Sequence, residues 1–170
     1  DQDHQIIVGQ HVSQQGNDKQ EVEPALAMLA DTTGRLPDKM SMDNGYMSGD
    51  NLEALETAVV DAYIATDRGD KSGQMGLAES TRKVVKADFQ YHESTDSFTC
   101  PGGQVLQLVK TNKRDRVYQG EASFCDQCEY KRLCCQSSKG AARTIATDDK
   151  EAIRQRMNVK MQQAESKAVY

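Results

Sequence analysis

The sequence is poor in the residues that build large hydrophobic cores. It contains no Trp, three Phe and six Tyr among 170 residues, and 37% of its residues are hydrophobic. A chain of this length forms one ordinary domain, or a core with a small appendage, so we expect a thin core. No run of 18 apolar residues occurs, which argues against a membrane-spanning helix, and no secretory signal precedes the first predicted strand. These absences favour a cytoplasmic protein without a membrane partner.

Charge is distributed unevenly along the chain. The net charge is −5 overall, but residues 1–70 alone carry −10 and residues 110–143 carry +4. An acidic front and a basic middle favour two surfaces with different partners. Solvated charge without a specific role is the alternative interpretation.

Apolar and amphipathic segments alternate over the first 65 residues. This strand, helix, strand, helix, strand order is typical of an α/β sheet with crossover helices. The caps of the two helices are expected at Asn17 or Asp18 and at an Asp50–Glu53 capping box. The three strands are predicted over residues 5–12, 39–42 and 61–65.

Asp43 directly follows the second predicted strand. In α/β sheets, ligands bind at the carboxyl ends of strands, which makes Asp43 a candidate functional residue. A single Asp at such a position also serves as a helix cap or a turn former, and both interpretations stay open at this point.

The composition changes after residue 66. The Gly-, Asp-, Lys- and Ser-rich stretch that follows is typical of a connection, and short alternating segments then predict a β-rich region. A long amphipathic helix is expected from a cap at Thr147 to the end of the chain. The predicted organisation is an α/β core over residues 1–66, a linker over 67–83, a β-rich insertion over 84–146 and a returning helix over 147–170.

Cysteines cluster in the predicted insertion with the spacing C-x24-C-x2-C-x5-C. Four thiolates at turns can hold one structural Zn²⁺ in tetrahedral geometry, and such a site would support a thin core. The predicted ligands are Cys100, Cys125, Cys128 and Cys134, with Cys135 or His92 as substitutes. Free thiols, a disulfide and a thioredoxin-like Cys125–Cys128 pair are the alternatives; the absence of a secretory signal disfavours the disulfide, and the position outside the α/β part disfavours the redox pair.

Several motifs together resemble those of DDE transposases from bacterial insertion sequences, in the group with a cysteine-bearing insertion. The stretch HQIIVGQHVSQQGND contains the Asn17–Asp18 pair, and the stretch MDNGYMS contains Asp43, Gly45, Tyr46 and Ser48 in an Asp-x-Gly-Tyr-x-Ser pattern. The Cys-Pro at Cys100 and the later Cys-x2-Cys with a trailing Cys match the insertion of that group. The resemblance runs from about residue 4 to the end of the chain.

The resemblance implies a partial ribonuclease-H-like fold in which three carboxylates hold two Mg²⁺ ions for DNA strand cleavage and transfer. Asp43 matches the second of these acids. The first is expected before Asp1, and the third, in a Glu-Pro motif, after about Tyr170, so we expect a piece of a longer protein. Glu151 and Glu165 lie outside that motif. The implied partners are transposon ends and target DNA, with a homo-oligomer in the intact protein.

Basic residues in the insertion are candidates for contacts with DNA phosphates, which would be salt-dependent and largely independent of sequence. Charge that only balances the acidic core is the alternative. A non-catalytic, zinc-stapled nucleic-acid-binding module, such as a decayed mobile-element remnant, is the competing function. The residues predicted to contact DNA are Lys110, Lys113, Arg114, Arg116, Lys131 and Arg132.

Overall fold

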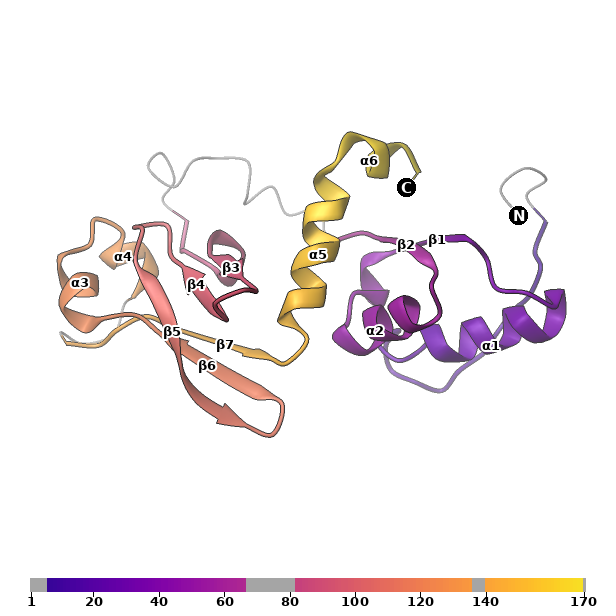
Figure 1. Cartoon of the computed structure of the whole chain (residues 1–170), viewed down its shortest axis with the longest axis horizontal. Helices are drawn as coiled ribbons and strands as arrows, with labels where there is room; N and C mark the ends of the chain where they lie inside the picture. Colours follow the sequence, from indigo (N-terminus) through magenta and orange to yellow (C-terminus); the bar gives the residue numbers. More distant parts are fainter. Residues whose placement is uncertain (1–5, 67–81, 136–139, 170) are drawn as a thin grey trace. The chain divides into compact units, whose positions relative to one another are not determined.

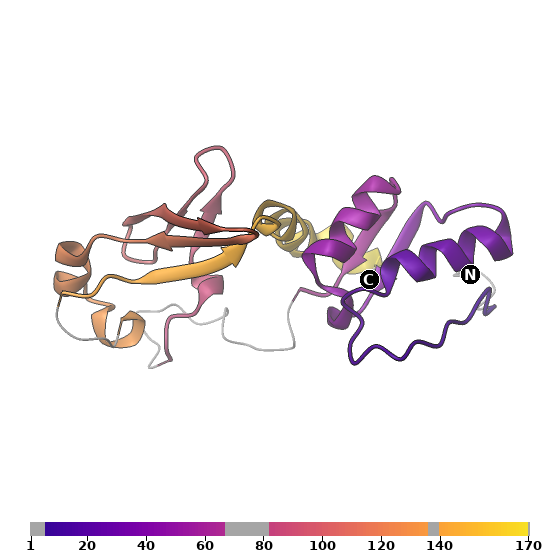
Figure 2. The same cartoon turned by 90° about the horizontal axis from the view of Figure 1, so that it is seen from below.

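The computed structural model describes residues 6–66, 82–135 and 140–169. The chain has a mixed α/β structure and divides into two compact units (Figures 1 and 2). Unit 1 comprises residues 1–68 and 153–170, and unit 2 comprises residues 69–152.

Unit 1 contains a parallel β–α–β motif. Strand β1 (Lys39–Met42) pairs in parallel with β2 (Asp61–Ile64), and α2 (Gly49–Thr57) connects them. Parallel neighbours need such a crossover, and α2 buries Leu52 and Leu55 against the strands. The strands predicted over 39–42 and 61–65 and the helix between them are confirmed.

Three further helices belong wholly or mostly to unit 1: α1 (Val22–Thr33), α5 (Glu151–Gln162) and α6 (Ala164–Val169). Among the helices that the structure describes, none is long and apolar enough to cross a membrane. Helix α5 packs one face against the core. Its Arg156 forms an ion pair with Glu56, with Nη2 2.9 Å from Oε1. The buried core of unit 1 consists of Val22, Leu26, Met42, Leu52, Leu55, Val60, Ala62, Ile64, Ile153 and Met157.

The strand predicted over residues 5–12 is wrong for the part that the structure describes. Residues 6–12 have no regular secondary structure, and the side chains of Ile7 and Val12 are 85% and 92% exposed. A β-branched sequence forms a strand only where a neighbouring strand completes its hydrogen bonds. No pairing to residues 6–12 occurs in the described ranges.

The predicted helix caps are also corrected. Helix α1 begins at Val22 after Glu21, not directly after Asn17 or Asp18, and the Glu21 side chain makes no cap. Helix α2 is capped by Ser48, whose Oγ accepts the Asn51 N–H at 3.2 Å, instead of by Asp50. The Ser48 hydroxyl satisfies one of the first amide groups of α2, and at α1 the Val22 N–H donates to Asn51 Oδ1 at 3.3 Å instead of to a capping residue.

Unit 2 is built on one antiparallel sheet whose strand order follows the sequence. Strand β5 is long, and its register shifts between Leu108 and Lys110. A bulge of this kind bends a strand and increases its twist. The strands are β3 (Gln90–His92), β4 (Ser97–Thr99), β5 (Val105–Asn112), β6 (Asp115–Gln119) and β7 (Thr144–Asp148).

Strand β7 replaces the predicted start of the last helix. Thr147 and Asp148 pair with β6 at Arg116 and Asp115, so they cannot begin a helix, and α5 starts at Glu151. Besides its strands, the insertion predicted to be β-rich contains two short helices, α3 (Ala122–Gln127) and α4 (Lys131–Cys134). The linker predicted over 67–83 lies almost wholly outside the described residues.

An aromatic cluster forms the centre of unit 2. Phe98 and Tyr118 are fully buried, with ring centroids 4.9 Å apart. Asp96 accepts hydrogen bonds from the hydroxyl groups of Tyr118 at 2.6 Å and Tyr91 at 2.8 Å, and Arg116 lies 3.2 Å from its second oxygen. Burial of Asp96 is more than offset by these bonds and by the nearby guanidinium, so the pKa of Asp96 lies below its ordinary value.

Candidate functional site

Asp43 lies at the carboxyl end of β1, as the sequence predicts. Its backbone is extended, and its Oδ1 accepts the Gly45 N–H at 2.7 Å, which opens a 3₁₀ helix over Asn44–Tyr46. The carboxylate is thus both a turn cap and an exposed group at a strand end. Asn44 donates to the carbonyl oxygen of Ala65, after β2, at 2.8 Å. The carboxyl ends of both parallel strands are therefore tied together.

The Asp18 carboxylate lies beside that of Asp43. A methyl group placed on the Cα of Gly45 would lie 2.7 Å from Asp18 Oδ2 and 2.9 Å from Asp43 Oδ1. Both carboxylates thus approach the same side of one glycine, and a larger residue there would displace at least one of them. The Asn17–Asp18 pair and the Asp43 segment, 25 positions apart in the sequence, form one acidic surface.

Asn51 holds these two segments together, and the sequence analysis did not identify it. It is 2% exposed, and its Nδ2 donates to the carbonyl oxygens of Asp18 at 2.8 Å and Tyr46 at 3.0 Å. Its Oδ1 accepts the Val22 N–H at 3.3 Å. The signal in the sequence is a polar residue beside Leu52 on the face of α2 that points to the core.

The acidic surface affects the pKa of Tyr46. Burial raises the pKa of Tyr46, and the negative charges of Asp18, Asp43 and Glu21 raise it further. Glu21 is itself buried and lies 3.1 Å from His11 Nε2. Three acidic side chains therefore lie near Tyr46 at this end of unit 1.

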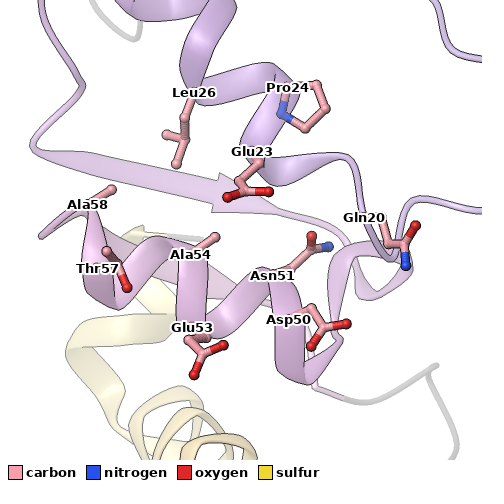
Figure 3. A pocket seen from close by; sticks show the side chains of 10 residues that line it. All are labelled: Gln20, Glu23, Pro24, Leu26, Asp50, Asn51, Glu53, Ala54, Thr57 and Ala58. Atoms are coloured by element: carbon pink, nitrogen blue, oxygen red, sulfur yellow. The ribbon is translucent and has the colours of Figure 1, made fainter.

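An open pocket of about 670 Å³ lies next to this surface, between α1 and α2. Figure 3 shows Glu23 and Leu26 of α1 facing Asn51 and Ala54 of α2 across it. Asn51 belongs to the wall of this pocket and also binds the Asp18 segment, so it connects the pocket with the acidic surface.

All five cysteines line a single small pocket in unit 2. Its volume is about 20 Å³, and Lys131 and Arg143 share its wall. Cys100 follows β4, Cys125 lies on α3, Cys128 ends α3 and Cys134 ends α4. The four predicted ligands, spread over 35 positions, therefore meet at one place.

The segment after Cys100 forms a tight turn around the sulfur atoms. Cys100 N–H donates to Gln104 O at 2.8 Å, and the Gln104 N–H donates back to Cys100 Sγ at 3.3 Å. A methyl group on Gly102 would lie 3.0 Å from Cys128 Sγ and 3.7 Å from Cys100 Sγ. The glycine permits the backbone to pass this close to the two sulfurs.

Cys134 and Cys135 have different environments. Burial raises the pKa of the Cys134 thiol to about 11 despite the opposing charge of Arg143. Cys135 is buried at 8% exposure, and its thiol donates to Ala141 O at 3.5 Å. None of the five cysteines forms a disulfide, and within the described ranges no three His, Cys, Asp or Glu side chains are grouped closely enough to hold a metal as they stand.

Two other candidates have partners of their own. His92 shares a hydrogen bond of 2.8 Å with Thr99 Oγ1 and is not part of the cysteine pocket. Glu151 lies 2.6 Å from Lys86 Nζ and accepts a hydrogen bond from Thr147 Oγ1 at 2.6 Å, within unit 2. Glu165 lies exposed in the first turn of α6.

The six basic residues predicted to contact DNA do not form one row. Lys110, Lys113 and Arg114 lie on the β5–β6 hairpin and are exposed. In Figures 1 and 2 the turn of this hairpin lies at the opposite end of unit 2 from α3 and α4. Arg116 pairs with Asp96, Lys131 pairs with Asp126 at 2.8 Å, and Arg132 is exposed on α4.

Comparison with known proteins adds no assignment. No protein-family model, no curated protein and no solved structure matches the chain.

Proposed function

We propose that this chain is part of the catalytic domain of a DNA transposase with a partial ribonuclease-H-like fold. The observation that carries the proposal is the position of Asp43, at the carboxyl end of a parallel strand with the Asp18 carboxylate on the same side of Gly45. Carboxylates at such strand ends are suited to hard divalent cations. The Asp-x-Gly-Tyr-x-Ser pattern around Asp43 supports the same assignment.

The donor chemistry at this surface suits Mg²⁺, which prefers carboxylate oxygens and retains several waters. Asp43 would hold the ion, with Asp18 adding negative charge beside it. When bound, Mg²⁺ polarises a phosphodiester and favours deprotonation of the attacking water or 3′-hydroxyl. The chain itself contributes the fixed turn that orients the Asp43 carboxylate through the Gly45 N–H.

Of the three carboxylates that the resemblance implies, this chain supplies Asp43. We therefore expect the chain by itself to bind a divalent cation weakly and not to cleave DNA. We expect Mn²⁺, used as a paramagnetic substitute for Mg²⁺, to broaden the NMR signals of Gly45 and Tyr46. Asp43→Asn should weaken this binding by about tenfold or more, because a neutral amide replaces a charged oxygen ligand.

Asp31→Asn is the matched control, since Asp31 is an exposed acid on α1. It should leave Mn²⁺ binding unchanged. Equal broadening in wild type and Asp43→Asn, or broadening spread evenly over all acidic residues, would contradict the assignment of Asp43.

The second candidate function is non-catalytic binding of nucleic acid by unit 2, stapled by a metal at its cysteines. The exposed Lys110, Lys113 and Arg114 on one hairpin favour it. Each lost phosphate contact lowers the slope of log K against log salt by about 0.9 for duplex DNA. We therefore expect the double variant Lys110→Gln, Lys113→Gln to lower the slope by about 2 for any duplex sequence.

Lys39→Gln provides the control for this measurement, because Lys39 is exposed on β1 of the acidic unit 1. Fluorescence anisotropy with a labelled duplex at several salt concentrations gives the slopes. A slope unaffected by the double variant would exclude the hairpin as a DNA-contacting surface.

A further inference from the structure

We infer that unit 2 binds one Zn²⁺ ion through the thiolates of Cys100, Cys125, Cys128 and Cys134, with Arg143 as a positioning residue that donates to a bound sulfur. The inference concerns unit 2 alone, so it does not depend on the role of Asp43. It also settles the choice between Cys134 and Cys135, which the spacing leaves open.

The size of the cysteine pocket selects the kind of ligand. A volume of about 20 Å³ holds one water molecule or one ion, since a water needs at least about 10–15 Å³ on this scale. Organic cofactors and substrates occupy hundreds of cubic ångströms. Thiolates prefer Zn²⁺ over Mg²⁺ or Ca²⁺ because sulfur is a soft ligand.

A buried hydrogen-bond donor in the wall of the cysteine pocket favours a negatively charged group inside it. Arg143 Nε is buried and has no hydrogen-bond partner among the described residues, although Arg143 Nη1 donates to Cys134 O at 3.0 Å. An unsatisfied buried donor is costly. A tetrathiolate zinc centre carries a net charge of −2 and supplies sulfur acceptors. A sulfur acceptor would satisfy Arg143 Nε, and the charge of Lys131 would partly balance that of the centre.

The turn after Cys100 is suited to a metal-bound sulfur. The Gln104 N–H already donates to Cys100 Sγ at 3.3 Å, and hydrogen bonds to a thiolate favour its charged form. Gly102 lets Cys100 and Cys128 lie on the same side of the turn. These two sulfurs come from segments 28 positions apart, so their proximity is a product of the fold.

Cys134, and not Cys135, completes the set. Cys134 and Cys135 both line the pocket with the other three cysteines, but the Cys135 thiol already donates to the carbonyl oxygen of Ala141. A zinc-bound Cys135 would lose that hydrogen bond. The four sulfurs are not grouped around one point as they stand in the described residues, so we expect zinc binding to change the χ1 rotamer of at least one of these cysteines.

Zinc content of the purified full chain tests the ligand assignment. We expect one zinc per chain by elemental analysis after preparation under reducing conditions without chelators. Single Ser variants of Cys100, Cys125, Cys128 and Cys134 should each weaken binding by at least about tenfold, and Cys135→Ser, the matched control, should retain the metal. Loss of zinc in Cys135→Ser with retention in Cys134→Ser would overturn the assignment.

Two further measurements do not depend on whether the cysteine variants fold. Co²⁺ added to the metal-free wild type should give the absorption of a tetrahedral thiolate complex and be displaced by Zn²⁺. Arg143→Gln should weaken Zn²⁺ binding by about tenfold, while Arg132→Gln, which removes an exposed charge outside the pocket, should not. Wild type that takes up neither Zn²⁺ nor Co²⁺ overturns the inference, and equal affinities in the two arginine variants overturn the role of Arg143.

Discussion

Replacing Asn51 by leucine should destabilise unit 1 by about 2–4 kcal/mol and loosen the acidic surface. The leucine fills similar space but removes three hydrogen bonds, and a buried group left without its partner costs about 1–3 kcal/mol. In this variant the Val22 N–H loses its acceptor, the Asn51 Oδ1 atom. The carbonyl oxygens of Asp18 and Tyr46 lose the Asn51 amide but still accept hydrogen bonds from backbone N–H groups. Urea denaturation, together with amide exchange at Val22 and Leu52, measures the loss in unit 1.

The same variant should lower Mn²⁺ binding at Asp43, because the Asp18 segment is no longer held beside it. Glu53→Gln on the same helix is the control; Glu53 is exposed, and we expect a change within about 0.5 kcal/mol. Wild-type stability in Asn51→Leu would show that the network around Asn51 does not hold the two segments together.

Asp96→Ala should destabilise unit 2 by about 2–3 kcal/mol, since it leaves the hydroxyl of the fully buried Tyr118, and that of Tyr91, without their acceptor. Asp96 also has a positive φ of 44°, a conformation that alanine adopts less readily than Asp or Asn. Asp96→Asn keeps an oxygen acceptor and tolerates this backbone, so it should cost clearly less. Equal losses in both variants would contradict the role assigned to the carboxylate oxygen.

Acid should weaken unit 2 through the same group. The folded pKa of Asp96 lies below its ordinary value of 3.8, so its contribution to stability is present above pH 3.8. That contribution is lost as the pH falls from 3.8 through the lower folded pKa. The free energy of unfolding should fall more steeply below pH 4 in wild type than in Asp96→Asn, and parallel curves would exclude Asp96 as the source.

The sequence predicts the β1–α2–β2 motif well because its signals are local. Residues 39–42 alternate polar and apolar side chains, residues 61–64 are mostly apolar and buried, and Leu52 and Leu55 mark the buried face of the helix between them. Pairing in such a motif requires only a crossover helix. The position of Asp43 follows directly from where β1 ends.

Elements that depend on distant partners are predicted poorly. Residues 6–12 have the composition of a strand but no pairing in the described ranges, while Thr147 has the composition of a helix cap but is drawn into the sheet by β6. The sequence marks Asn51 only as a polar residue on the core-facing side of its helix, and its partners Asp18 and Tyr46 are brought to it by the fold. In each case the deciding contact lies far away in the sequence.

The cysteine site is predicted from the sequence only in part. The Cys125–Cys128 pair is a local signal, and it predicts a shared ligand without the fold. Cys100 and Cys134 join it only because β4 and α4 end at the same pocket. The environment of Cys135, which separates it from its neighbour, depends on Ala141 and is invisible in the spacing.

The proposed function implies a longer protein that contains all three carboxylates, and DNA cleavage by that protein tests the proposal most directly. In Mg²⁺ and with labelled duplex DNA, we expect strand cleavage by the wild type and its loss, by at least about a hundredfold, in Asp43→Asn. Asp31→Asn should cleave like the wild type. Cleavage that persists unchanged in Asp43→Asn, or a complete protein that neither binds a divalent metal nor cuts DNA, would contradict the assignment.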